Sequence, residues 1–330
     1  MNALVTGAGG WLGRCLVGKL IAKGHTVICI DLWPAQHPTP VLRSRKKNIR
    51  IVKGDIRRPE RFIKEMRGCD AVFNCAGSQH PGWTSELYEI NSLAPERVLR
   101  CCQKAGVPRL IHVSSSTVYG SNHGGSPFTE ESPLRPLTHY ARSKAKGDNL
   151  LLAPEKSPST DVVIIRPAVF YSTQPSPNMV SLVNMVRARK AVLFGKRGFL
   201  RTYVDIRKVV DVLLLAQRKG ERNGIYLVGD EQPLDTLSLY EALAEPMGVS
   251  IRPIRMPVVV SRLCEKSALL GGYLNVHLKY PNIVGEFGRD HVFSSEKAKR
   301  QLSYRPKGSS EEGLRTMAGA VAEARAGASG

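Results

Sequence analysis

The sequence lacks the features that would place it in a membrane, in a disulfide framework or around a metal. It has no run of about 18 uninterrupted apolar residues, so we expect no transmembrane helix. Its seven cysteines contain no Cys-x-x-Cys pair, and several lie within apolar runs, which is typical of buried thiols in a reducing compartment. The first apolar strand begins at residue 2 or 3, so no signal or transit peptide is expected. We therefore predict a cytoplasmic protein with no metal site.

Acidic residues are scarce as well. The chain of 330 residues has 48 lysines and arginines but only 28 aspartates and glutamates, which gives a formal net charge of +20. The cations cluster within residues 43–50, 57–67 and 187–201. We interpret this charge chiefly as solvated surface; an anionic substrate, an acidic carrier protein and a peripheral membrane surface are the alternatives. Because these stretches contain few aromatic residues and no recognisable nucleic-acid-binding motif, no nucleic-acid partner is expected.

What the sequence does contain is a repeated alternation of strand and helix patterns. Hydrophobic residues make up 42% of the chain, which is enough for a sizeable core. We expect strands at 3–5, 26–30, 48–56, 70–77 and 110–116, with helices between them, including one over about 87–105. This pattern predicts an α/β fold with a doubly wound parallel sheet. Such sheets bind ligands at the carboxyl ends of their strands.

A glycine-rich turn follows the first strand. Gly7, Gly10 and Gly13 have the spacing Gly-x-x-Gly-x-x-Gly where the strand turns into a helix, and Trp11 and Leu12 lie inside the motif. The first glycine permits a tight turn, the second lets the backbone approach a pyrophosphate, and the third lets helix pack on strand. Together with the strands that follow, the motif predicts a dinucleotide phosphate site.

Two aspartates end the next two strands. Asp31 lies where a carboxylate can accept both hydroxyls of an adenosine ribose and repel a 2′-phosphate, which favours NAD over NADP. Cations within Arg43–Lys47 could nevertheless hold a phosphate. Asp55 can accept from an adenine amino group, with Ile56 packed on the ring. The alternative role for Asp55 is the N-cap of a helix over 59–67, and the two roles are compatible.

Two small residues and a tyrosine–lysine pair follow. Ala76 and Gly77 end the fourth strand and let the backbone pass close to a cofactor. Tyr140 and Lys144 are four residues apart, so on a helix they lie on one face. A phenol with a pKa of ~10 is a poor proton carrier at neutral pH, and a nearby ammonium favours its phenolate. Such a pair can exchange a proton with an oxygen while a cofactor moves a hydride.

Taken in order, these motifs resemble the extended short-chain dehydrogenases/reductases, the NAD-dependent epimerase/dehydratase group. The resemblance rests on the glycine motif, the two strand-end aspartates, the stretch Ser114–Gly120, Tyr140-x-x-x-Lys144 and Arg166-Pro167. It is strong over residues 1 to about 170 and weak beyond them. It implies a Rossmann-type sheet that binds NAD, and a smaller, mostly C-terminal lobe that selects the substrate.

The resemblance also implies roles for individual residues. Tyr140 would be the acid/base, and Lys144 would bind the nicotinamide ribose and depress the pKa of Tyr140. Ser115 would hydrogen-bond the reacting oxygen, with Ser116 and Thr117 as rivals for that role. The cofactor-binding residues implied are Gly7, Gly10, Trp11, Leu12, Gly13, Asp31, Asp55, Ile56, Ala76, Gly77, Tyr140, Lys144 and Pro167.

The pattern changes beyond residue 170. Strands are expected at 203–205 and 224–228 and helices over 179–189, 207–219 and 236–247. We predict that residues 1–170 form the NAD-binding domain and that 199–229 return to it. Residues 171–198 and 230–330 would then form the substrate lobe.

The distal half departs from the sugar-nucleotide members of the family. Val169 stands where those members usually carry an asparagine, and the distal layout looks more like the 3β-hydroxysteroid-dehydrogenase-like branch, whose substrates are often lipophilic alcohols or ketones. We expect an NAD(H)-dependent oxidoreductase that interconverts a lipophilic secondary alcohol and its ketone. The alternatives are a nucleotide-sugar 4-epimerase or dehydratase with tightly bound NAD, and a non-catalytic cofactor sensor. The expected partners are a small-molecule substrate and, as an open alternative, a second copy of the chain.

One distal helix bears on the substrate. Apolar residues recur at helical spacing within 258–274, with charged residues between them. We predict either a helix that faces the core or one that walls an apolar substrate pocket. The residues concerned are Val259, Leu263, Leu270 and Leu274.

Overall fold

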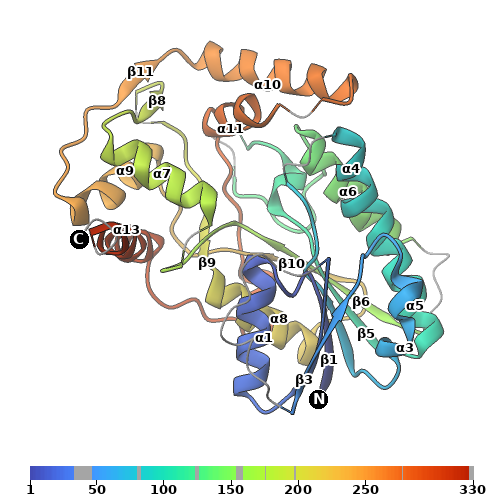
Figure 1. Ribbon diagram of the computed structural model, residues 1–330. Coiled ribbons are helices and arrows are strands. Elements are labelled where there is room, and N and C mark those ends of the chain that lie inside the picture. The colour runs from blue at the N-terminus through green and yellow to red at the C-terminus, as the bar shows by residue number, and fades with distance from the viewer. Residues whose placement is uncertain are drawn as a thin grey trace.

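A parallel seven-stranded sheet forms the base of the molecule (Figure 1). The computed structural model describes residues 1–32, 47–79, 83–122, 126–153, 159–174, 176–196, 198–276 and 278–326. The strand order is β10-β6-β5-β4-β1-β2-β3, so the winding direction reverses between β1 and β4. This confirms the doubly wound α/β sheet. The strands are β1 (Asn2–Thr6), β2 (Thr26–Asp31), β3 (Ile49–Lys53), β4 (Ala71–Asn74), β5 (Arg109–Val113), β6 (Asp161–Pro167) and β10 (Gly224–Val228).

Helices cover both faces of this sheet, which explains why its strands read as continuous apolar runs. Successive residues of β1 point to opposite faces: Ala3 and Val5 join the core on one side, and Leu4 joins the core on the other. The first core lies under α1 (Trp11–Ala22), α8 (Ile206–Lys219) and α12 (Glu296–Leu302). The second lies under α3 (Ile63–Met66) and α5 (Ala94–Ala105).

The helix expected over 87–105 begins earlier and is irregular. It starts as α4 (Thr84–Tyr88), widens into a π-helical turn (Glu89–Leu93) and continues as α5. The helix α6 (His139–Leu151) packs beside it. The π-helical turn therefore lies against the helix that carries Tyr140 and Lys144.

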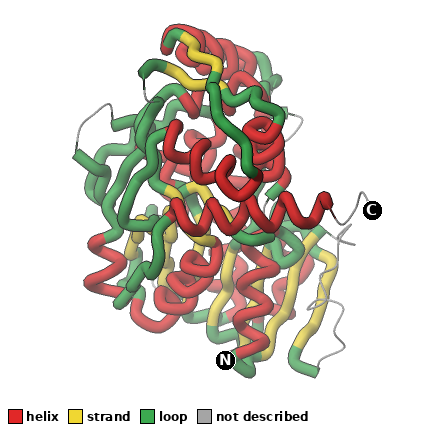
Figure 2. Tube along the Cα trace, turned by 90° about the vertical axis from the view of Figure 1, so that its left-hand side faces the viewer, coloured by secondary structure: helices red, strands yellow, loops and turns green. Residues whose placement is uncertain are grey.

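The distal segments gather at the carboxyl edge of the sheet (Figures 1 and 2). One group of helices shares a third core, and two short strand pairs, β7 with β9 and β8 with β11, join the segments. The helix α10 (Val258–Tyr273) packs on α11 (Lys279–Phe287). No helix in the described ranges has the length and apolar character needed to cross a bilayer. The remaining strands and α-helices are β7 (Val169–Tyr171), α7 (Pro177–Arg187), β8 (Val192–Phe194), β9 (Tyr203–Asp205), α9 (Thr236–Ala244), β11 (Ile254–Met256) and α13 (Ser310–Ala326).

Candidate active site

The turn between β1 and α1 is so tight that it excludes side chains. Gly7 has a φ of 66°, and a Cβ atom on it would lie 2.7 Å from the Cα atom of Ala76. A Cβ atom on Gly13 would lie 2.0 Å from the carbonyl oxygen of Gly7. The glycines therefore leave the N-terminus of α1 as a cradle of backbone groups. Such a cradle suits a pyrophosphate.

Two other residues of the motif use their side chains for packing. The indole N–H of Trp11 donates to the carbonyl oxygen of Gln174 (2.7 Å), and its ring meets Phe170 edge-on with the ring centroids 6.0 Å apart. Leu12 is buried in the core. Trp11 thereby ties the glycine loop to the segment around β7. Pro167 ends β6 at the same edge of the sheet.

Asp31 lies against the glycine loop. Its carboxylate accepts hydrogen bonds from the backbone N–H groups of Gly9 (2.8 Å) and Leu32 (2.8 Å). These bonds fix the carboxylate at the place where a ribose diol is expected, and that contact stays a prediction. Three of the cations considered as a phosphate site, Arg43, Arg45 and Lys46, lie outside the described residues.

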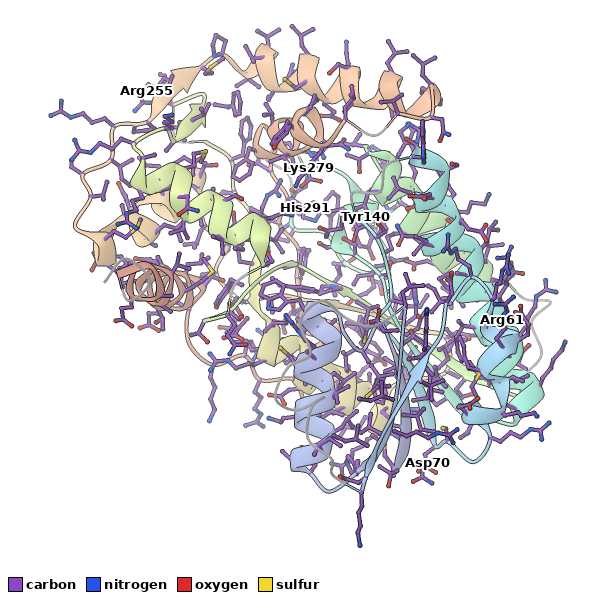
Figure 3. The ribbon with its side chains drawn as sticks, in the orientation of Figure 1. Arg61, Asp70, Tyr140, Arg255, Lys279 and His291 are labelled. Atoms are coloured by element: carbon purple, nitrogen blue, oxygen red, sulfur yellow. The ribbon has the colours of Figure 1, made fainter. Side chains whose placement is uncertain are left out.

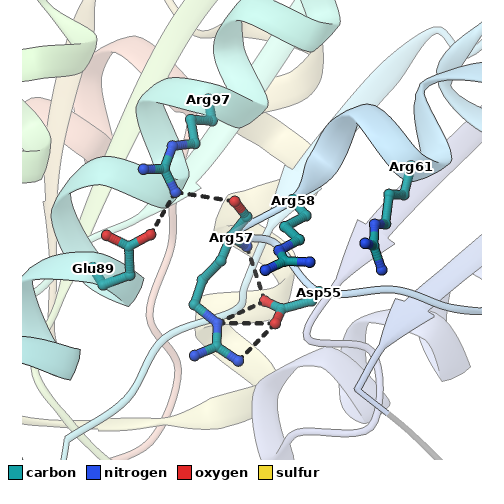
Figure 4. Close-up of a pocket in the computed structure, with 6 residues that line it drawn as sticks. All are labelled: Asp55, Arg57, Arg58, Arg61, Glu89 and Arg97. Carbon is teal, nitrogen blue, oxygen red and sulfur yellow. Dashed lines mark hydrogen bonds and ion pairs between the residues drawn. The ribbon is translucent and has the colours of Figure 1, made fainter.

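A cavity of about 420 Å³ opens beside Asp55 (Figure 4). Burial would raise the pKa of Asp55, but the ion pair with Arg57 (2.7 Å) and a hydrogen bond from the Arg57 backbone N–H (2.9 Å) bring it below its usual value. The expected N-cap role is wrong, because the following helix begins as a 3₁₀ turn at Pro59 without a side-chain cap. Ile56 is buried in the adjoining core, and the adenine contact stays a prediction. The cavity is lined by Asp55, Arg57, Arg58, Arg61, Glu89 and Arg97.

The helix α6 brings Tyr140 and Lys144 to the carboxyl edge of the sheet. Thr138 caps the helix by accepting a hydrogen bond from a backbone N–H in its first turn (3.1 Å). The Nζ atom of Lys144 donates to the carbonyl oxygen of Val113 at the end of β5 (3.0 Å). A Cβ atom on Gly77 would lie 3.1 Å from this Nζ atom, so the small residue after β4 makes room for the lysine.

Burial controls the protonation of this pair. It raises the pKa of Tyr140, and the charges of Glu286 and Asp148 add to the rise, while hydrogen bonds with the side chains of Gln79 and Ser115 oppose it. Burial also lowers the pKa of Lys144 to about 8. Lys144 is not among the groups that shift the pKa of Tyr140, so the expected lowering of that pKa by Lys144 stays a prediction.

The three hydroxyls after β5 have different partners. The Oγ atom of Ser115 lies 2.8 Å from Oγ1 of Thr117, and Ser115 also hydrogen-bonds Tyr140. The Oγ atom of Ser116 lies 2.9 Å from Nε2 of His291. Figure 3 shows His291 and Tyr140 in the same region, between the distal helices α10 and α11 and the sheet. Of the three hydroxyls, the Ser115 hydroxyl is thus the one joined to Tyr140, and Thr117 supports it.

A buried ion pair beneath α6 escaped the sequence reasoning. The Nε atom of Arg166 donates to Oδ2 of Asp148 (2.9 Å), and Ser114 donates to the same oxygen (2.8 Å). Oδ1 of Asp148 has no hydrogen-bond partner within the described part of the chain, and burial raises the pKa of this carboxyl. Because Asp148 follows Tyr140 and Lys144 at the same spacing of four, that periodicity could have identified it.

Asn91 is a second residue to which the sequence gives no role. It lies in the π-helical turn, accepts from the backbone N–H of Ser78 (3.0 Å) and donates to the Ser78 carbonyl oxygen (2.8 Å). It also donates to Oγ of Ser143 in α6 (3.1 Å). Asn91 therefore joins the backbone after β4 to the helix that carries Tyr140.

Paired charges form the side of the site that α10 and α11 contribute, which we call the lobe side. Arg201 donates to the backbone carbonyl of Glu286, and its guanidinium lies 3.7 Å from the Glu286 carboxylate. Arg289 is buried and lies 3.0 Å from Glu265. The carboxylate of Glu286 is near enough to Tyr140 to raise its pKa. Each of these arginines therefore has an anionic partner on α10 or α11.

The helix α10 differs from what its sequence pattern predicts. Its apolar stripe faces outward, and the helix packs through small residues: Ser261, Ala268 and Gly272. A Cβ atom on Gly272 would lie 2.0 Å from the ring of His139, so no larger side chain fits there. The prediction of a core-facing or pocket-facing stripe is wrong, because these small residues make the inward contacts. The exposed fractions of Val259, Leu263, Leu270 and Leu274 are 56%, 60%, 63% and 72%.

Known proteins share both the sequence pattern and the architecture. A sequence model of the NAD dependent epimerase/dehydratase family matches residues 3–229. The 4-hydroxy-2-methyl-3-oxo-4-farnesyl-3,4-dihydroquinoline-1-oxide ketoreductase of Stigmatella aurantiaca is 24% identical over 95% of each chain. A 3beta-hydroxysteroid-dehydrogenase/decarboxylase of Arabidopsis thaliana is 27% identical over 94% of this chain and 77% of its own length. A solved dTDP-glucose 4,6-dehydratase of Streptomyces venezuelae with NAD bound is 26% identical, with a TM-score of 0.79 over 99% of this chain and 98% of its own.

Proposed function

Because the chain belongs to the NAD-dependent epimerase/dehydratase family of extended short-chain dehydrogenases/reductases, we propose that it reduces a lipophilic ketone to a secondary alcohol with NADH. The observation that carries this proposal is a half-buried Tyr140 with a raised pKa, hydrogen-bonded to Ser115. A phenol that stays protonated at neutral pH is ready to act as an acid. Reduction needs an acid at the carbonyl oxygen, whereas oxidation needs a base.

Tyr140, Ser115 and Lys144 have different roles in proton transfer. NADH supplies the hydride when it is bound. Tyr140 gives its proton to the carbonyl oxygen, which becomes the alcohol hydroxyl, and Ser115 donates a second hydrogen bond to that oxygen. The phenolate left on Tyr140 is stabilised by the charge of Lys144 one helical turn away and regains its proton from solvent.

The structure has the groups needed to hold the cofactor. The backbone cradle at Gly7 and Gly13 fits a pyrophosphate because a Cβ atom at either position would overlap the backbone. The carboxylate of Asp31, fixed by two backbone N–H groups, fits the ribose hydroxyls. The fit therefore supports assigning both functions to these residues.

The paired charges on the lobe side favour an uncharged substrate. Arg201 and Arg289 are each held by a glutamate, and the carboxylate of Glu286 would repel a diphosphate near Tyr140. Val169 replaces the asparagine that meets the sugar or its phosphate in sugar-nucleotide members. The names of two relatives, a farnesyl-quinoline ketoreductase and a hydroxysteroid dehydrogenase, point to the same substrate class.

The second candidate is a nucleotide-sugar 4,6-dehydratase or 4-epimerase. It is favoured by the solved dTDP-glucose 4,6-dehydratase, which matches nearly the whole chain. In this alternative, the substrate diphosphate would displace Glu286 and Glu265 and take over Arg201 and Arg289.

A substrate series separates the two candidates. Straight-chain methyl ketones of increasing length and cyclic ketones of increasing ring number would be mixed with the protein and NADH, and oxidation followed by nicotinamide absorbance. We expect kcat/KM to rise about fourfold per added methylene until the site is full, since each buried methylene contributes ~0.8 kcal/mol. A flat ketone series, together with turnover of a dTDP- or UDP-sugar, would overturn the proposal in favour of the second candidate.

A further inference from the structure

An exposed apolar surface runs along α10 and into α11. Large side chains that face solvent gather on this helix and on the turn that follows it, and a backbone bridge from Val276 brings Trp83 beside them. Figure 1 shows α10 along the edge of the molecule opposite the N-terminus. We call this set the α10 surface: Trp83, Val259, Leu263, Leu270, Tyr273, Leu274, Val276 and Tyr280.

The packing of α10 explains why these side chains face outward. Small residues bring the helix close to its neighbours: a Cβ atom on Gly285 of α11 would lie 2.9 Å from Cβ of Glu265, and one on Gly288 would lie 1.9 Å from Oγ of Ser261. These contacts fix the inner face of α10 and leave its leucines on the opposite side. A contiguous apolar patch on an outer face is a mark of an interaction surface.

The charges around the patch identify its partner. Residues 252–280 include one acid, Glu265, which pairs inward with Arg289. The same stretch has five lysines and arginines, and all five are exposed, with two of them on α10 itself beside the leucines. The exposed charges of this stretch are therefore positive throughout its described part. The five cations are Arg252, Arg255, Arg262, Lys266 and Lys279.

We propose that the α10 surface docks the protein on a lipid bilayer with anionic headgroups. Leucines on one face of a helix, flanked by lysine and arginine, are the pattern of a helix that lies in the membrane interface. The exposed tyrosines and tryptophan of the patch are residue types that favour the level of the headgroups. An acidic protein would account for the cations, but it would leave the leucine stripe without an apolar partner.

The docking surface adjoins the candidate active site. The Nε2 atom of His139 lies 3.1 Å from the Leu269 carbonyl oxygen of α10, and Arg142 donates to the hydroxyl of Tyr273 (2.8 Å). Tyr140 lies between His139 and Arg142 in the sequence. If the proposed function holds, a lipophilic ketone dissolved in the bilayer would therefore reach the site close to the membrane surface. The docking itself does not depend on that reaction.

Vesicle sedimentation tests the proposal without any turnover. The full chain would be mixed with vesicles of phosphatidylcholine alone, or with vesicles that also contain phosphatidylglycerol. We expect binding to the anionic vesicles to be about tenfold stronger, and Leu270→Glu to weaken it about tenfold or more. Ile51→Glu introduces the same charge at another exposed apolar residue, on the edge strand β3, and should bind like the wild type. Arg262→Gln/Lys266→Gln should weaken binding to the anionic vesicles only.

Two results would overturn the docking proposal. The first is the absence of binding to anionic vesicles. If Leu270→Glu then abolishes self-association in sedimentation velocity, the patch is a contact between copies of the chain. The second is equal loss in Leu270→Glu and Ile51→Glu, which would mean that overall charge and not this surface drives binding. A cooperative thermal unfolding transition would establish that each variant is folded. Ketone reduction is measured separately, so failure of either proposal leaves the other standing.

Discussion

The two sides of the candidate active site are formed by different kinds of residue. The cofactor side consists of backbone and small residues at strand ends, where Gly13 has no room for one additional carbon atom. The lobe side consists of long charged side chains, with Arg201 paired to Glu286 and Arg289 to Glu265. We therefore expect substitutions on the cofactor side to act by steric overlap, and substitutions on the lobe side to act by changing the local charge.

Gly13→Ala should have the largest effect. Its Cβ atom would lie 2.0 Å from the Gly7 carbonyl oxygen, so the loop must shift and NADH binding should be lost. Thermal unfolding should show a cost of about 1–3 kcal/mol, as for an overpacked core. Gly319→Ala in α13 is the matched control, because its new Cβ atom would meet its nearest neighbour at 3.7 Å and should leave NADH affinity unchanged. Equal NADH affinity in the two variants would contradict the steric explanation for Gly13.

Lys144→Met should weaken NADH binding and change how stability depends on pH. In the folded protein the pKa of Lys144 is about 8, below its ordinary value of 10.5. Between these values the unfolded chain binds more protons than the folded one, so wild-type stability rises with pH relative to the variant. The free energy of unfolding of Lys144→Met minus that of the wild type should therefore fall from about pH 8 to about pH 10.5. A constant difference across this window would show that Lys144 titrates normally.

Asp31→Asn should narrow the preference for NADH over NADPH. Removing the charge removes the repulsion of a 2′-phosphate, and we expect a change of about tenfold in the ratio of the two dissociation constants. Fluorescence titration with both reduced cofactors measures this ratio. Asp70→Asn, at the opposite end of the sheet (Figure 3), is the control and should leave the ratio unchanged. Tighter binding of NADPH than NADH by the wild type would remove the role given to Asp31.

Glu286→Gln should have the smallest effect. The Glu286 carboxylate contributes to the raised pKa of Tyr140, so its removal should lower that pKa. Reduction requires the protonated phenol, and the alkaline decline of kcat/KM should therefore move to lower pH, by less than about one unit because Glu286 is partly exposed. Glu311→Gln on α13 should leave the profile in place. A move to higher pH would contradict the assignment of this limb to Tyr140.

The same comparison explains what could be predicted from sequence. Glycine spacing and strand-end acids are local patterns, so they led to the sheet and to the loop that Gly7 and Asp31 form. The positions of Ser115, Tyr140 and Lys144 followed from motifs whose geometry lies within single elements and strand ends. His291 joins Ser116 across 175 residues of sequence, and no local pattern encodes such a contact.

Two other features, the π-helical turn and the orientation of α10, also could not be predicted from the sequence. The π-helical turn that aims Asn91 at Ser78 changes helical phase without a sequence signature. The stripe of α10 has the correct helical period, but the period does not say which face is inside. Small residues such as Gly272 decide that, because they allow the close approach to His139.

Turnover of Tyr140→Phe, measured together with NADH affinity, tests the central claim most directly. The substitution removes one hydroxyl from a half-buried side chain and leaves the glycine loop, Asp31 and Lys144 in place. We predict that the best ketone of the series will be reduced ~10²–10⁴ times more slowly, with NADH affinity close to that of the wild type. Unchanged turnover in Tyr140→Phe would contradict proton transfer by this tyrosine, and with it the proposed reaction.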